Sequence, residues 1–119
     1  MAARKAERKL RDEIHDAMVS VQALSMSGQV SIPMPQRRAL KGHAGALFEQ
    51  WIELEAARFN LDGQAYIDAA AGVRASLAGL HAEIAAIDNA ISVVNQATSA
   101  IIAVDGLLNI AVKHLPISP

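Results

Sequence analysis

Asp12 and His15 are the residues whose types and spacing come closest to a metal-binding motif. They lie three positions apart, which places both side chains on one face of a helix. A di-iron centre of the ferritin-like kind needs two Glu-x-x-His motifs and two further carboxylates, and the sequence contains no Glu-x-x-His. We therefore expect Asp12 and His15 to be solvent-facing polar residues, and we predict no metal site and no cofactor.

A cluster of glutamates is the strongest candidate for acid–base chemistry: Glu49, Glu53 and Glu55. Because Glu49 and Glu53 share a helix face opposite apolar residues, a solvated polar face explains them better than a catalytic site. The sequence also lacks a glycine-rich phosphate loop, a nucleophile elbow and any cysteine. We predict no catalytic residue, which favours a protein that is not an enzyme.

The composition excludes several other classes of protein. Of 119 residues, 52% are hydrophobic and 19% are charged, and the formal net charge is −1. The apolar fraction excludes a disordered chain, and the balanced charge does not favour a nucleic-acid partner, despite basic clusters within 4–11 and 37–41. The N-terminal residues lack the apolar stretch of a secretory signal. We expect a cytoplasmic protein without a membrane span.

Two breaks divide the chain into helical segments of a single domain, residues 1–119. Apolar residues at alternating spacings of four and three predict a first helix over about 3–26. Glycine and two prolines then indicate a linker over 27–35. A second helix is predicted over about 36–60, ending at the turn-forming residues 60–63. The aromatic residues near this turn are expected to fill the core: Phe48, Trp51, Phe59 and Tyr66.

The segment from 64 to 115 contains the longest pattern in the sequence. Its apolar stripe keeps one heptad phase from Tyr66 to Leu115, which favours a continuous helix. Such a helix would be about 75 Å long, whereas a compact domain of this size measures roughly 35 Å across. We therefore predict an all-α antiparallel bundle of three helices with a long C-terminal helix over about 64–115. The alternative is a four-helix bundle, if that helix breaks near Gly79 or between Asn95 and Ser99.

The apolar stripe of this segment is the candidate interaction surface. Eight members would form a seam between two copies of the chain: Ile84, Ile87, Ile91, Val94, Ile101, Leu108, Val112 and Leu115. Thr98 and Asp105 occupy positions in the same stripe and are the polar core candidates. Because burying an unpaired carboxylate costs several kcal/mol, Asp105 should cap a short final helix, meet a cation across an interface, or serve as a functional carboxylate.

These features predict a non-catalytic helical module for protein–protein interaction that self-associates through the stripe, with a homodimer as the first expectation. An adaptor, regulator or inhibitor of an unidentified protein partner fits the same features. Two alternatives stay open. One is a small helical-bundle enzyme or a ligand- or metal-binding protein, whose site would gather Asp105 with Glu83, His81 or His15. The other is reversible insertion of the apolar C-terminal segment into membranes.

Overall fold

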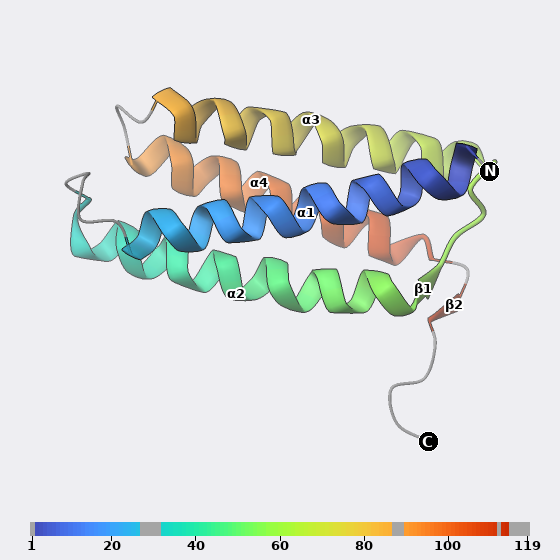
Figure 1. The fold of residues 1–119 in the computed structure, drawn as a ribbon, viewed down its shortest axis with the longest axis horizontal. Helices are drawn as coiled ribbons and strands as arrows, with labels where there is room; N and C mark the ends of the chain where they lie inside the picture. The colour runs from blue at the N-terminus through green and yellow to red at the C-terminus, as the bar shows by residue number, and fades with distance from the viewer. Residues whose placement is uncertain (1, 27–31, 87–89, 112, 115–119) are drawn as a thin grey trace, which may run out of the picture.

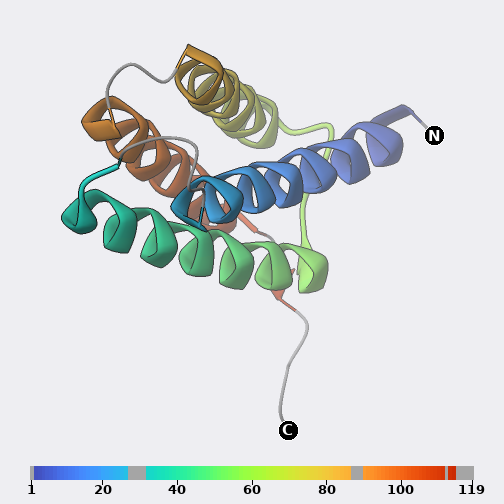
Figure 2. The same cartoon turned by 60° about the vertical axis from the view of Figure 1, so that its left-hand side comes forward.

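The computed structural model describes residues 2–26, 32–86, 90–111 and 113–114. Its elements, in order, are α1 (Ala2–Met26), α2 (Met34–Ala56), β1 (Ala57–Arg58), α3 (Gln64–Ala86), α4 (Ala90–Asn109) and β2 (Lys113–His114). The four helices that it describes run alternately up and down and pack as an all-α bundle (Figure 1 and Figure 2). Within the bundle, α1 contacts α2 and α3, and α4 contacts α3 and α2.

The first helix is where the apolar spacing predicts it. The side chains of Leu10, Ile14 and Val21 are between 0% and 2% exposed, because spacings of three and four residues bring them to one face. This face meets the fully buried residues of the other helices, and together they form one core: Leu40, Leu47, Val73, Leu80, Val93, Val104 and Leu107.

Both ends of α2 differ from the prediction. The helix begins at Met34, two residues early, because Pro35 is tolerated within the first turn, where a missing backbone N–H costs nothing. The predicted linker is correspondingly shorter at this end, and its residues 27–31 lie outside the described residues. The helix ends at Ala56, since Ala57 and Arg58 pair antiparallel with His114 and Lys113. This pairing also contradicts a C-terminal helix that reaches 115.

The continuous helix predicted over 64–115 is wrong, and the four-helix alternative is confirmed. After α3 ends at Ala86, the chain reverses, and α4 packs back along α3 from Ala90 onward. A straight helix of about 75 Å would exceed the longest extent of the molecule, 43 Å. The helix α3 ends at Ala86 and not at either predicted break, since Gly79 and residues 95–99 lie within helices; residues 87–89 lie outside the described residues.

The two predicted break positions lie against each other inside unbroken helices. A Cβ atom added at Gly79 would lie 3.1 Å from the side-chain oxygen Oε1 of Gln96. Glycine within a helix costs about 1 kcal/mol relative to alanine. At this point the absence of a side chain on Gly79 leaves room for the side-chain amide of Gln96.

The buried face of α4 is shifted by one residue from the predicted stripe. In α3 the stripe is buried as expected: Tyr66, Ala70, Val73, Leu77 and Leu80. In α4 the residues immediately before stripe members are buried: Val93, Ala97, Ala100, Val104 and Leu107. Leu108 is the one member of the stripe in α4 that is also buried. The phases of α3 and α4 differ because the first helix ends at Ala86 and a separate helix begins at Ala90. Small side chains at Ala97 and Ala100 allow close helix packing there.

Candidate functional site

The predicted seam is largely in contact with its own chain. Leu108 is buried, whereas Ile91 is 55% exposed. Three members are half-buried against the core: Ile84, Val94 and Ile101. The other three members lie outside the described residues: Ile87, Val112 and Leu115. Self-association through this stripe stays a prediction, and its described part offers mainly Ile91 to a second copy.

Thr98 and Asp105 are exposed, so neither is a core residue. Asp105 contacts α2 through Gln50. Gln50 is the buried residue of the pair, with 6% of its surface exposed. Its Nε2 atom donates hydrogen bonds to Oδ1 of Asp105 (2.8 Å) and to the carbonyl oxygen of Ile101 (2.9 Å). Within the chain, Asp105 therefore meets the neutral amide of Gln50. The helix α4 continues past it to Asn109, so Asp105 does not cap a final helix.

His43 forms a second contact between α2 and α4. Its Nε2 atom lies 2.9 Å from Oγ1 of Thr98, whose hydroxyl donates to the carbonyl oxygen of Val94 (3.0 Å). Because the hydroxyl has one proton and gives it to Val94, His43 must be the donor to Thr98. Burial lowers the pKa of His43 from its ordinary value of 6.5.

The residues named for an enzyme or metal site are not gathered together. His15 packs on Trp51, with ring centroids 4.9 Å apart, while His81 and Asp105 are exposed on other helices. Glu83 lies beside a small polar hollow between α3 and α4. In the described parts of the chain, no three histidine or carboxylate side chains are placed to hold a metal ion.

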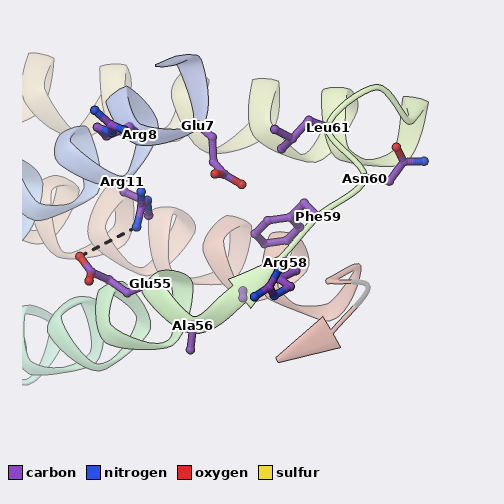
Figure 3. Close-up of a pocket in the computed structure, with 10 residues that line it drawn as sticks. Glu7, Arg8, Arg11, Glu55, Ala56, Arg58, Phe59, Asn60 and Leu61 are labelled. Carbon is purple, nitrogen blue, oxygen red and sulfur yellow. Dashed lines mark ion pairs between the residues drawn. The ribbon is translucent and has the colours of Figure 1, made fainter. Parts of the chain in front are cut away.

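A hollow of about 580 Å³ lies where the first turns of α1 meet the end of α2 and β1 (Figure 3). Arg8, Arg11 and Arg58 line it, and such guanidinium groups bind carboxylates and phosphates. Nη1 of Arg11 lies 4.0 Å from Oε1 of Glu55, and the buried Nε of Arg11 has no hydrogen-bond partner among the described residues. Glu7 and Glu55 offset two of the three positive charges, so the hollow attracts an anion only weakly.

Tyr66 lies next to Phe59, which lines this hollow. Its hydroxyl is nevertheless a poor proton donor or acceptor. Its ring packs on Phe59, with centroids 5.3 Å apart. Burial raises the pKa of Tyr66, and the carboxylate of Glu7 raises it further. The buried hydroxyl makes no hydrogen bond to the described residues. The group is neutral at physiological pH, and no side chain in the described part of the chain is hydrogen-bonded to take its proton. The hollow could not be found from the sequence, because β1 brings Arg58 to α1 only in the folded chain.

Most of the exposed large apolar side chains in the described part of the chain lie on α1 and α2. These helices carry five of the eight large apolar side chains that the described residues expose: Val19, Met26, Met34, Phe48 and Ile52. Phe48 stacks on the half-buried ring of Trp51, with centroids 6.0 Å apart and an interplanar angle of 30°. The expectation that all four aromatic residues fill the core is therefore wrong for Phe48, which is 43% exposed.

α4 is the most apolar helix in the described part of the chain. By length and composition alone it is the one described helix that could cross a membrane, and a third of that stretch is buried in the bundle. Its exposed surface carries Ile91 and Ile102, which are 55% and 65% exposed. The core helix of a water-soluble bundle meets the same criterion, so this property alone does not select a function.

Comparison with known proteins found no matching family model, no matching curated protein and no matching solved structure. The function therefore has to be argued from the surfaces described above.

Replacing Gln50 and Asp105 separately tests which residue stabilises the contact between α2 and α4. Gln50→Ala removes a buried side chain with both of its hydrogen bonds, and we expect it to lower the free energy of unfolding by about 2 kcal/mol. Asp105→Ala should cost less than about 1 kcal/mol, because the carboxylate is exposed and Gln50 keeps its bond to Ile101. Urea denaturation measures both values, and a greater loss for Asp105→Ala would contradict this account.

The lowered pKa of His43 predicts how stability depends on pH. As pH falls below 6.5, the unfolded chain binds a proton at this residue before the folded chain does. The contribution of His43 to stability is therefore complete above its ordinary pKa and is lost as pH falls toward its lower, folded-state pKa. Urea midpoints recorded across this range should decrease with falling pH, and less so in His43→Gln. An identical pH dependence in this variant would show that other groups are responsible.

Proposed function

We propose that the chain is a non-catalytic helical module for protein–protein interaction and that it self-associates as a homodimer. The observation that supports this proposal is the set of large apolar side chains left outside an already closed core, each between 43% and 73% exposed. Single exposed apolar residues are common on any protein surface. Five of these eight share two adjacent helices, and such grouping is typical of an interaction surface.

The energies of burial and association favour a grouped surface over an isolated residue. Burying one phenylalanine or isoleucine is worth roughly 1.5–3 kcal/mol, whereas association costs roughly 4–15 kcal/mol before any contact is counted. Each copy offers Ile91 and Ile102 on α4, but five large exposed apolar side chains on α1 and α2. A dimer through α1 and α2 therefore has the larger driving force, and a reversible dimer suits a small adaptor, regulator or inhibitor.

Light scattering over a concentration series tests self-association directly. We expect the measured mass to rise from the monomer value of 12.6 kDa toward twice that value, because burial of the exposed side chains favours the dimer at high concentration. A constant mass of 12.6 kDa up to the millimolar range would contradict the proposal.

A flotation assay with neutral lipid vesicles is the accompanying control. In the proposed function the protein stays unbound, because the exposed apolar groups are covered by a second copy. Stable binding that releases α4 from the bundle would instead support the membrane-insertion alternative and contradict the interaction module.

A further inference from the structure

We propose that the second copy docks on the exposed face of α2, with the two α2 helices antiparallel; this inference rests on the self-association proposed above. The α2 face is an exposed stripe at alternating spacings of four and three residues: Met34, Arg38, Lys41, Gly45, Phe48 and Ile52. Glu49 and Glu53, also exposed, lie beside its second half. This spacing is the one that lets two helices pack along a shared line.

The centre of the α2 face is hollowed. A Cβ atom added at Gly45 would meet nothing within 4 Å, so no part of the described chain covers this position. Next to it lies a hollow of about 400 Å³, lined in part by Gly45, Lys41 and Phe48. A missing side chain allows another helix to come close, and a neighbouring hollow can take a large side chain.

Antiparallel pairing about this centre supplies that side chain. Phe48 lies one turn beyond Gly45, so reversing the second helix sets each Phe48 beside Gly45 of the second copy. The ring, which is 43% exposed in the single chain, then enters the hollow. Ile52 of one copy comes to lie over the aliphatic stem of Lys41 of the other, which removes a further exposed apolar side chain from water.

The charges of α2 select the antiparallel orientation. Arg38 and Lys41 lie in its first half and Glu49 and Glu53 in its second, and none of the four forms an ion pair within the described part of the chain. Antiparallel docking brings the basic half of each copy to the acidic half of the other, twice by symmetry. Parallel docking would place like charges together, which is unfavourable.

The exposed side of α4 lacks this complementarity. Its apolar residues, Ile91 and Ile102, are separated by the polar residues Asn95 and Thr98. Asp105 is the one charged residue of α4, so a pair of α4 helices has no opposite charges to fix its orientation. Shape and charge together therefore favour α2 over α4 as the helix through which the second copy docks.

Charge reversal at either end of α2 tests the orientation. The variant Arg38→Glu/Lys41→Glu and the variant Glu49→Lys/Glu53→Lys should each weaken the dimer by about tenfold or more, since each places like charges together. The variant with all four substitutions should recover the affinity of the original chain, because its two ends are again complementary. Sedimentation equilibrium measures the dissociation constants, and helical circular dichroism confirms that each variant is folded.

A cysteine at the centre of the α2 face tests the location independently. The chain contains no cysteine, so Gly45→Cys introduces a single thiol that antiparallel docking places near its counterpart, within reach of a disulfide. Gly72→Cys is the matched control, because Gly72 is also an exposed helical glycine with open space around it. We expect mild oxidation to give a covalent dimer for Gly45→Cys and not for Gly72→Cys.

The outcomes separate this inference from the proposed function. A dimer that tolerates both charge reversals, and for which Gly45→Cys cross-links no better than Gly72→Cys, would overturn docking through α2 and leave self-association in place. A chain that is monomeric at every concentration, before any substitution, would overturn both.

Discussion

The packing of α4 against α3 is the contact on which the other features of the molecule depend. A continuous helix over the same residues would leave one apolar stripe uncovered along most of its length. Folding back lets each helix cover the other, and at Gly79 a Cβ atom would lie 3.1 Å from the side-chain oxygen of Gln96. Once α4 lies on α3, its position beside α2 is also fixed, and the bundle closes around one core.

A closed core changes what a second copy can contribute. The described helices bury their core within one chain, so the proposed dimer adds surface contacts to a core that is already packed. Any partner must use the outer surfaces, where apolar side chains are fewer and are mixed with charged residues. This arrangement suits a reversible dimer better than an obligate one. It favours the outer side of α2 over the seam predicted on α4 as the interface of the proposed dimer.

The sequence predicted the parts of the fold that depend on local spacing. The alternation of apolar residues located α1 and the buried face of α3, because large apolar side chains recur there at spacings of three and four. In α4 the same method failed, since alanines such as Ala97 are buried where the pattern favours larger neighbours such as Val94. The prediction therefore followed the continuous phase of the preceding helix and assigned Thr98 and Asp105 to the core.

Other features depend on contacts between residues far apart in the chain. The pairing of β1 with β2 ends α2 four residues early, and no local signal at Ala57 or Arg58 indicates it. Phe48 is exposed because of the way α2 is rotated about its axis in the bundle. The apolar surface of α2 is wide, so its sequence pattern alone does not determine this rotation. The partner of Asp105 was missed for the same reason, because Gln50 has no sequence relation to it.

The fold-back of α4 onto α3 is tested most directly by a chemical cross-link within one chain. The double variant Gly79→Cys/Gln96→Cys places one thiol on α3 and one on α4 at positions that face each other, in a chain that otherwise has none. The variant is treated with a short bifunctional thiol reagent at high dilution. We expect a cross-link within one chain, so that the product migrates as a monomer on denaturing gels. Linkage mainly between chains, or none at all, would mean that α3 and α4 do not pack on each other as described.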